Sequence, residues 1–304
     1  MRRSAPHPFT LRQLQYLVAV ADHQSFRRAA EACAVSQPSL STQVAQVEAA
    51  LGLVVFERLA RGVAVTEAGA EILERARRTL LEADALVSTA ERACDPLAGT
   101  LRVGLIPTVA PYLLPEIAPL LRAKFPRLQL LWSEEKTPTL VVRVASGALD
   151  AGILALESEL GELETEALGR DAFVLAVPRG HKLAQGGPVR MQELDGETVL
   201  LLDDGHCFRA QALAVCQRAG ADEAAVRATS LSTLAQMVVG GTGITLLPEL
   251  ALGAENRTGT LVTRRFGPRG PARTLVLAWR KTAPSAPVLH AMAETIRGVL
   301  SHRL

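Results

Sequence analysis

The apolar residues of the N-terminal third recur at helical spacing, and strand-like alternation is almost absent there. Positions 11–21 carry an apolar residue at every third or fourth place, which predicts a helix. A second helix is expected to begin after Ser25, and a third to run from Ser36 to Gly52. Serine favours the start of a helix and glycine its end.

Two short apolar runs follow, at 54–58 and 63–66, and they predict a small hairpin around a turn at 61–62. The pattern from 66 to 93 is then an unbroken amphipathic helix of about 28 residues, roughly 42 Å long. One small domain cannot cover a helix of this length. Because a long helix with one apolar seam usually pairs with a copy of itself, we expect a dimer contact here.

After residue 98, short apolar runs alternate with helical stretches. This alternation is typical of mainly parallel sheets with helices on both faces. Since many strands fall within about 200 residues, two smaller α/β lobes with a cleft between them are favoured over one sheet. The expected elements are strands at 101–106, 128–132, 151–156, 173–177, 199–202, 244–247 and 275–279, and helices at 112–124, 138–148, 207–219, 231–240 and 286–300.

The composition is that of a folded protein. Of 304 residues, 48% are hydrophobic and 21% charged, which excludes extensive disorder. No run approaches the roughly 18 apolar residues of a membrane span, and positions 1–15 lack the apolar core of a secretory signal. We therefore expect a cytoplasmic protein with no membrane partner. Four cysteines make no disulfide scaffold, so a pair that oxidises in such a chain is regulatory rather than structural.

Charge alone does not identify a partner. The net charge is +2, and positions 1–66, with seven Arg against four acidic residues, carry +3. Two short helices with a tight turn, over about 26–45, are typical of a helix-turn-helix whose second helix reads base edges through amide and hydroxyl groups. A generic helical hairpin with a polar face explains the spacing about equally well.

A wider set of segments raises the helix-turn-helix above a generic hairpin. The segments are Phe9-Thr10-Leu11-Arg12-Gln13-Leu14, Ser25-Phe26, Ala29-Ala30, Ser36-Gln37-Pro38-Ser39-Leu40-Ser41, Val47-Glu48, Leu51-Gly52, Phe56-Glu57-Arg58 and Thr66-Glu67-Ala68-Gly69. Together they resemble the winged helix-turn-helix of LysR-type transcriptional regulators.

The resemblance covers the whole chain and implies its architecture. The fold class is α/β, with a mostly-α winged helix-turn-helix domain, a long linker helix that dimerises, and a two-lobed regulatory domain similar to periplasmic solute-binding proteins. The implied boundaries are 1–66 for the DNA-binding domain, 67–97 for the linker, 98–304 for the regulatory domain, about 98–170 and 275–304 for lobe I, and about 171–274 for lobe II.

The same resemblance implies the partners. These are double-stranded promoter DNA, RNA polymerase and further copies of the chain, which assemble as a dimer of dimers through paired linker helices. Arg58 and Arg61 are expected to meet the DNA backbone near the wing. The residues expected to face the bases are Ser36, Gln37, Pro38, Ser41, Thr42 and Gln43.

A cysteine-containing segment narrows the resemblance further. Asp203-Asp204-Gly205-His206-Cys207-Phe208-Arg209-Ala210-Gln211 precedes Cys216, and it is similar to the peroxide-sensing members of the family, as are the segments at 105–115 and 227–231. Cys207 follows an apolar strand and begins a predicted helix, where free N–H groups and the helix dipole favour a thiolate. His206 and Arg209 add positive or donor character nearby.

The resemblance implies roles for these residues. Hydrogen peroxide would oxidise Cys207 to a sulfenic acid, and Cys216 would capture it as a disulfide. Thr108 and Thr137 would hydrogen-bond the peroxide, with His206, Gln211 and Arg273 nearby. The segment departs from the family at position 210, which is Ala where the peroxide-sensing members commonly carry Asp; this affects proton handling and reaction rate.

The spacing of the two cysteines has its own consequence. If 207–216 is one continuous helix, the two Cα atoms lie about 13 Å apart. A disulfide needs about 4.4–6.8 Å. The segment must therefore unwind before the bond forms, so oxidation changes its shape.

Two other functions remain possible at this point. One is a LysR-type regulator that binds a small organic effector in the cleft, with inert cysteines, and the other is a peroxidase, which would leave the first 95 residues unused. Cys33 is expected in the core and Cys94 at an exposed helix end. No His, Cys, Asp or Glu cluster has metal-ligand spacing, so no metal and no cofactor are expected.

Overall fold

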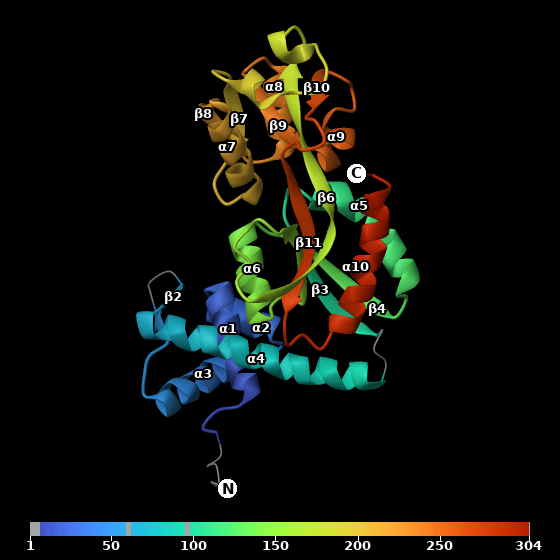
Figure 1. The fold of residues 1–304 in the computed structure, drawn as a ribbon. Coiled ribbons are helices and arrows are strands. Elements are labelled where there is room, and N and C mark those ends of the chain that lie inside the picture. Colours follow the sequence, from blue (N-terminus) through green and yellow to red (C-terminus); the bar gives the residue numbers. More distant parts are fainter. Residues whose placement is uncertain (1–6, 59–61, 95–97, 304) are drawn as a thin grey trace. The chain divides into compact units, whose positions relative to one another are not determined.

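The computed structural model describes residues 7–58, 62–94 and 98–303. The chain divides into two compact units, at 1–90 and 91–304 (Figure 1). Within the described ranges, no helix is both long and apolar enough to cross a membrane.

The first unit consists of helices and one small hairpin, as the periodicity predicts. The side chains of Thr10, Ser25 and Ser36 each accept a backbone N–H at a helix start, and Gly52 ends the third helix with a φ of +68°. The elements are α1 (Leu11–His23), α2 (Phe26–Ala32), α3 (Gln37–Leu51), β1 (Phe56–Arg58), β2 (Val63–Val65) and the start of α4 (Glu67–Cys94).

Side chains bind the hairpin to the helices on either side. The Glu48 carboxylate, on α3, accepts the backbone N–H groups of Val55 and Phe56 at 2.7 and 3.1 Å. The Thr66 hydroxyl accepts the N–H of Gly69 in the first turn of α4. A Cβ at Gly69 would lie only 2.4 Å from the Val55 carbonyl oxygen, so glycine permits this close approach. Glu48 and Thr66 thus have a structural role, because they join the hairpin to α3 and α4.

Helix α4 has the length and position that its periodicity predicts, within one residue at each end. Its N-terminal half buries Leu73 and Ala76 in the core of the first unit. Further along, Leu86 and Val87 are 74% and 61% exposed. The helix therefore presents apolar side chains that the rest of the first unit does not cover.

The second unit is an α/β fold whose strands form one continuous hydrogen-bonded order, β4-β3-β5-β11-β6-β9-β7-β8, with β10 also on β6. Its strands are β3 (Gly99–Leu105), β4 (Leu128–Glu134), β5 (Ala151–Ala155), β6 (Leu163–Pro178), β7 (Thr198–Leu202), β8 (Asp222–Ala228), β9 (Ile244–Pro248), β10 (Leu261–Arg265) and β11 (Ala272–Arg280). Its helices are α5 (Ala110–Lys124), α6 (Thr137–Ser146), α7 (Cys207–Ala219), α8 (Leu231–Val239), α9 (Glu249–Glu255) and α10 (Ala286–Ser301), with two 3₁₀ turns, η1 (Lys182–Ala184) and η2 (Met191–Leu194).

Two lobes share this sheet. Lobe I contains β3, β4 and β5, which pair in parallel, with helices α5, α6 and α10; lobe II contains β7, β8 and β9, also parallel, with α7, α8 and α9. The long strand β6 pairs with β11 on the lobe I side and with β9 and β10 on the lobe II side. Figure 1 shows β6 and β11 running from one lobe to the other. The expectation of mainly parallel pairing thus holds inside each lobe, while β6, β10 and β11 pair antiparallel.

A buried ion pair lies where these strands pass between the lobes. Arg273, on β11, and Asp171, on β6, are both completely buried, with Nη2 and Oδ2 2.9 Å apart. The Arg273 guanidinium also donates to the Thr108 hydroxyl at 2.6 Å and to its carbonyl at 3.0 Å, in the loop after β3. The other Asp171 oxygen accepts the N–H of Leu250, in the first turn of α9. One hydrogen-bonded cluster therefore joins lobe I, both crossing strands and lobe II.

We expect Asp171→Ala to lower the free energy of unfolding of the second unit by about 3–5 kcal/mol, because Arg273 would keep a buried charge without a partner. A matched control is Arg265→Ala, which removes an ion pair with Glu249 whose arginine side chain is 74% exposed. Exposed pairs contribute about 1 kcal/mol or less. Urea unfolding of both variants measures the difference, and equal losses would contradict a special role for the buried pair.

Candidate functional site

The two cysteines of the predicted switch lie on one helix. Cys207 is the first residue of α7 and half-buried; Cys216 lies on the same helix and is completely buried in the core. Because α7 is continuous from 207 to 219, the nine-residue spacing separates their Cα atoms by about 13 Å. Burial also raises the pKa of Cys216 to about 11. In this conformation Cys216 is thus a protonated core thiol that cannot bond to Cys207.

Cys207 lines a cavity of about 720 Å³ between the two lobes. Thr137, the first residue of α6 in lobe I, lines it too, together with His206 and Gln211 from lobe II. Among the described residues, the Thr137 hydroxyl and both polar atoms of the Gln211 side chain are buried and have no hydrogen-bond partner. A small molecule able to donate and accept hydrogen bonds beside Cys207 would satisfy these groups. Ala210 also lines this cavity and offers it a methyl group where an acid would bind protons.

Thr108 and Arg273 lie in a different environment. Thr108 lines a neighbouring cavity of about 430 Å³, which His206 also lines. Arg273 is held by Asp171 and Thr108, and its guanidinium carbon lies 5.4 Å from the centre of the Phe208 ring. Phe208 directly follows Cys207. The structure thus brings Thr137, His206, Cys207 and Gln211 together in one cavity, and it connects Arg273 to the start of α7 through Phe208.

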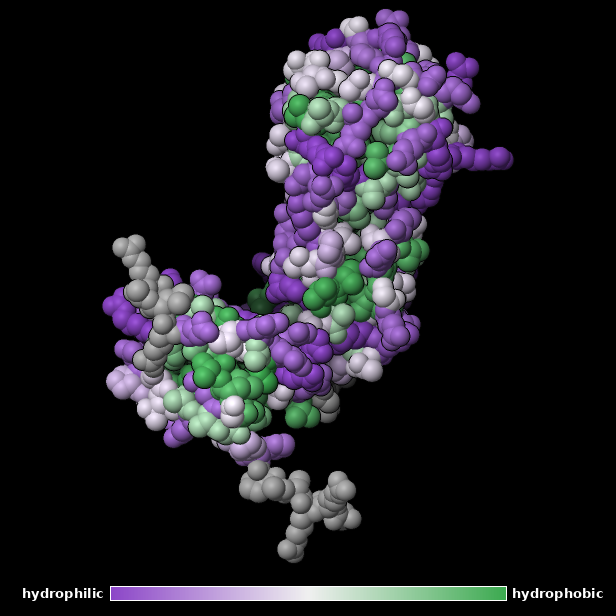
Figure 2. Space-filling model, turned by 90° about the vertical axis from the view of Figure 1, so that its left-hand side faces the viewer, coloured by the Kyte–Doolittle hydropathy of each residue, from purple (hydrophilic) through white to green (hydrophobic). Residues whose placement is uncertain are grey.

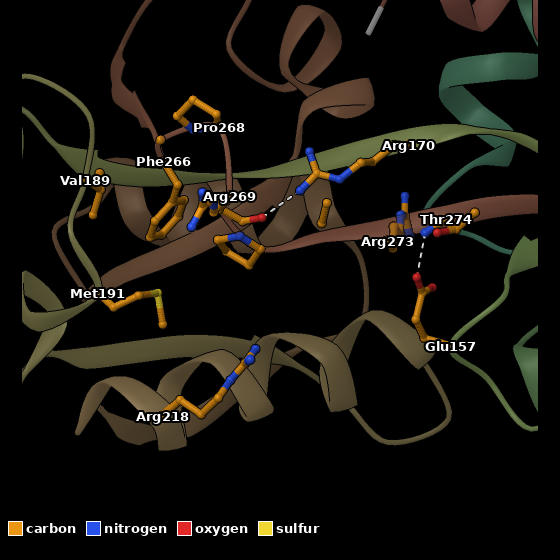
Figure 3. Close-up of a pocket in the computed structure, with 14 residues that line it drawn as sticks. Glu157, Arg170, Val189, Met191, Arg218, Phe266, Pro268, Arg269, Arg273 and Thr274 are labelled. Carbon is orange, nitrogen blue, oxygen red and sulfur yellow. Dashed lines mark hydrogen bonds between the residues drawn. The ribbon is translucent and has the colours of Figure 1, made fainter.

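A larger cavity, of about 980 Å³, adjoins that of Cys207 and is shown in Figure 3. Arg170, Arg218 and Arg269 line it from β6, α7 and the turn between β10 and β11. Arg170 donates to the carbonyl of Gly270 at 2.7 Å. Both cavities are lined by Glu157 and Arg218. Sequence reasoning missed this basic cavity, because residues far apart in the chain form it and no local motif marks them.

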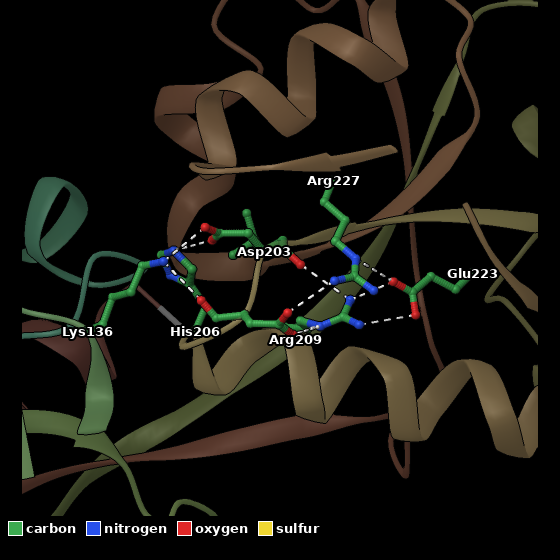
Figure 4. Close-up of polar contacts among 8 residues, drawn as sticks. Lys136, Asp203, His206, Arg209, Glu223 and Arg227 are labelled. Carbon is green, nitrogen blue, oxygen red and sulfur yellow. Dashed lines mark hydrogen bonds and ion pairs between the residues drawn. The ribbon is translucent and has the colours of Figure 1, made fainter. Parts of the chain in front are cut away.

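The Arg209 side chain is engaged by carboxylates of lobe II, although the sequence suggests that it adds positive or donor character near Cys207. Its guanidinium donates to both oxygens of Glu223, at 2.7 and 3.2 Å, and to Asp204 at 2.9 Å. Arg227 pairs with the same two carboxylates, each at 3.1 Å (Figure 4). The hydrogen bond from Arg209 lowers the pKa of Glu223. The charge of Arg209 is thus balanced by two carboxylates, and its positive charge is not reserved for Cys207.

His206 was expected to add positive or donor character, and its surroundings favour the second. It is buried, and its Nε2 lies 3.0 Å from Asp203 Oδ1. Burial lowers the pKa of His206, and the positive charge of Lys136 lowers it further. The residue before Cys207 is therefore a neutral imidazole at neutral pH, which can serve as a donor or an acceptor but not as a cation.

The lowered pKa of His206 predicts a pH-dependent stability. Below about pH 6.5, the ordinary histidine pKa, the unfolded chain takes up a proton before the folded protein does. Folding stability conferred by neutral His206 is therefore lost as the pH falls. We compare the free energies of unfolding of the wild type and of His206→Gln. The wild-type value minus the variant value should be smaller at pH 5.5 than at pH 7.5. Urea unfolding at both pH values measures this; a pH-independent difference would show that His206 titrates normally.

The expected DNA-facing residues lie at the start of α3. Gln37 and Thr42 are exposed, as are Ser36 and Pro38, while Ser41 is half-buried. Gln43 is also half-buried, and its side-chain oxygen accepts a hydrogen bond from Gln13 on α1 at 2.9 Å. The N-terminal turn of the helix thus has a polar exposed face, and Gln43 has a competing partner within the protein.

The remaining predictions concern two arginines, two cysteines and metal ligands, and only some of these residues lie in the described parts of the chain. Arg61 and the side chains of Arg58 and Cys94 lie outside the described residues. Cys33 is half-buried and packs against the core of the first unit, as expected. No group of three His, Cys, Asp or Glu side chains within the described parts of the chain is arranged to hold a metal ion.

Comparison with known proteins agrees with this architecture. Residues 11–70 match the family model "Bacterial regulatory helix-turn-helix protein, lysR family", and residues 95–301 match "LysR substrate binding domain". The chain belongs to the LysR family. As a LysR-family member it has the winged helix-turn-helix and the two-lobed α/β regulatory domain that the sequence predicts.

Individual relatives are similar over nearly the whole chain. A hydrogen peroxide-inducible genes activator of Dickeya chrysanthemi is 43% identical over 289 residues, 94% of each chain. The DNA-binding transcriptional dual regulator OxyR of Escherichia coli K12 is 43% identical over 288 residues, again 94% of each. A full-length OxyR variant from Pseudomonas aeruginosa has a similar structure, with a TM-score of 0.76, 34% identity, and coverage of 96% of this chain and 95% of that one.

A further solved structure carries the peroxide itself. A Corynebacterium glutamicum OxyR mutant with hydrogen peroxide bound has a TM-score of 0.67 and 32% identity, and covers 99% of this chain and 95% of its own. The resemblance to peroxide-sensing members of the LysR family, first visible around Cys207, is therefore confirmed across the chain.

Proposed function

We propose that this LysR-family protein is a DNA-binding transcriptional regulator that senses hydrogen peroxide through Cys207 and controls oxidative-stress genes. The observation that carries the proposal is the cavity in which Cys207 meets unpartnered polar groups of Thr137 and Gln211. The similarity to hydrogen peroxide-inducible genes activators supports it. A small organic effector would also satisfy these polar groups, but it would not explain the similarity to peroxide-responsive relatives over nearly the whole chain.

The chemistry proceeds in two balanced steps. The Cys207 thiolate attacks one peroxide oxygen, an S–O bond forms, the O–O bond breaks, and hydroxide leaves with the electron pair. The polar groups of Thr137 and Gln211, with neutral His206, hold the peroxide and stabilise the departing oxygen. The Cys216 sulfur then attacks the sulfenic acid, the disulfide forms, and water leaves. Arg273, on the crossing strand β11, and Thr108, in the loop after β3, support the cavity from one side.

The second step requires a change of shape. Cys216 is buried and its thiol is protonated, and the α7 helix holds it about 13 Å from Cys207 along the chain. Since a disulfide spans about 4.4–6.8 Å between Cα atoms, α7 must unwind and release Cys216 from the core. Oxidation thus changes the conformation of lobe II, and this conformational change reports the presence of peroxide.

Stoichiometric hydrogen peroxide should produce a disulfide between Cys207 and Cys216, detectable by mass spectrometry of the peptides. Backbone amides from 205 to 220 should then exchange hydrogen faster than in the reduced protein, because the helix is lost. Cys207→Ser should keep the reduced exchange pattern after peroxide. Cys216→Ser should form the sulfenic acid and keep the helix. Identical exchange in the reduced and disulfide forms would rule out the rearrangement.

DNA binding follows from the first unit. The first two turns of α3 offer Gln37 and Thr42 to base edges, with Ser36, Pro38, Ser41 and Gln43 beside them. We assign Arg58 and Arg61 to the phosphate backbone. Gln37 is exposed and can pair with adenine in the major groove. Binding to promoter DNA should weaken steeply with salt, because backbone contacts release counterions.

We expect Gln37→Ala to reduce the preference for a promoter fragment over random DNA by about tenfold, since one good base contact contributes about 1–3 kcal/mol. Affinity for random DNA should stay within about twofold. Gln185→Ala, the same substitution at an exposed position of the regulatory domain, serves as the control. Titration of labelled duplexes at fixed salt measures both affinities, and an equal loss on both DNAs would remove Gln37 from base readout.

The exposed apolar side chains of α4 are suited to a dimer contact. Leu86 and Val87 are uncovered within one chain, and we assign them to a contact with the same helix of a second copy. Two such dimers would form the tetramer, which recruits RNA polymerase in the cytoplasm. The proposed role is regulation rather than turnover: a peroxidase would reduce peroxide catalytically with a reductant, whereas this protein is consumed once per signal until it is reduced.

A further inference from the structure

A lysine ties the two lobes together at the edge of the Cys207 cavity. Lys136 caps the start of α6 in lobe I, and its ammonium donates to Asp203 Oδ2 at 3.0 Å and to the Asp204 carbonyl at 2.9 Å in lobe II (Figure 4). Its aliphatic stem packs over Gly205, where a Cβ would lie 3.0 Å from the Lys136 Cδ. Gly205 has a φ of +89°, so glycine serves both the turn and this close approach.

The two residues of the Lys136–Asp203 ion pair each lie next to a residue of the cavity. Lys136 directly precedes Thr137, whose unpartnered hydroxyl lies in the cavity. On the other side, the second Asp203 oxygen lies 3.0 Å from Nε2 of His206, which directly precedes Cys207. The contact sequence is therefore Thr137, Lys136, Asp203, His206 and Cys207. A peptide bond joins the residues at each end, Lys136 and Asp203 form an ion pair, and the Asp203 carboxylate contacts the neutral His206 ring.

We infer that Lys136 is a positioning residue for the peroxide step. Its ion pair with Asp203 sets the separation between the Thr137 hydroxyl and the Cys207 sulfur, which belong to different lobes. The inference rests on the proposed function, because it assigns Lys136 to the same cavity. Geometry of this kind is effective in catalysis, since misplacing a group by about 1 Å can slow a reaction by up to about 100-fold.

The ion pair is suited to orientation more than to stability. The side chains of Lys136 and Asp203 are 41% and 34% exposed, so solvent screens their attraction and its contribution to folding is small. The hydrogen bond from Lys136 nevertheless lowers the pKa of Asp203, which keeps this carboxylate ionised and able to hold both Lys136 and His206. Loss of the lysine should therefore alter the reaction without unfolding the protein.

The test measures sulfenic acid formation at Cys207 by rapid mixing with hydrogen peroxide and mass spectrometry of the peptide. All variants are made in the full chain with Cys216→Ser, so that oxidation stops at the first step. We expect Lys136→Met to react about tenfold more slowly than the parent, and Lys136→Arg to stay within about threefold because it can still reach Asp203. Asp203→Asn, a second route to the same loss, should also slow the reaction.

Two controls separate positioning from other effects. Lys182→Met removes the same charge and an ion pair with Glu197 at 2.7 Å, but inside lobe II and away from the cavity, so its rate should match the parent. Alkylation of Cys207 by iodoacetamide should change less than about twofold in Lys136→Met, because that reaction does not use Thr137.

Each outcome bears on the inference. An unchanged peroxide rate in Lys136→Met, or an equal slowing of peroxide and iodoacetamide, would overturn it and leave peroxide sensing intact. Non-additive losses when Lys136→Met and Asp203→Asn are combined would support a shared role. If the parent protein formed no sulfenic acid at Cys207, the proposed function would fail as well.

Discussion

The fixed rise of the α-helix is the constraint on which the rest of this site depends. Helix α7 holds Cys207 at its first residue, at the edge of a cavity, and Cys216 two and a half turns later in the core. One cysteine is thus available to a small molecule while the other is kept away from both solvent and its partner.

The lobes are held around α7 by two unlike kinds of contact. At the crossing strands, Arg273 and Asp171 are completely buried and fully hydrogen-bonded, so their geometry is rigid and costly to disturb. At the mouth of the cavity, Lys136 and Asp203 are partly exposed and can separate at little cost. The buried contact therefore fixes the crossing strands, while the partly exposed contact orients the loop before Cys207 and can be broken with little loss of folding energy when α7 unwinds.

Sequence reasoning located elements with strong periodicity or clear caps, and it missed those without them. Helix α7 and the 28-residue α4 were predicted because their apolar spacing and boundary residues agree. The short helix α9 was missed. So were the N-terminal half of β6 and the whole of β8 and β10, because Leu163–Pro178 begins with mostly polar residues, Asp222–Ala228 has only a short alanine-rich apolar run, and Leu261–Arg265 is brief and ends in two arginines. Their strand conformation comes from pairing with neighbours, which no local pattern encodes.

The site shows the same division. The motif around Cys207 marked His206 and Gln211 because they adjoin it, and Thr137 followed from the resemblance. Lys136 and Asp171 gave no local signal, since each acts through a partner far away in the chain. Arg209 was placed correctly near Cys207, but Glu223, fourteen residues later, decides which way its charge points.

The burial of Cys216 also determines how the molecule recovers. Moving this side chain out of the lobe II core leaves a cavity behind, and deleting even small buried groups costs folding energy in proportion to the space left. In the proposed oxidised form, the disulfide alone would hold the protein in that less stable packing. Once a reductant cleaves the bond, the core can refill and the helix can wind again without any further input. The oxidised conformation would therefore persist only as long as the Cys207–Cys216 disulfide.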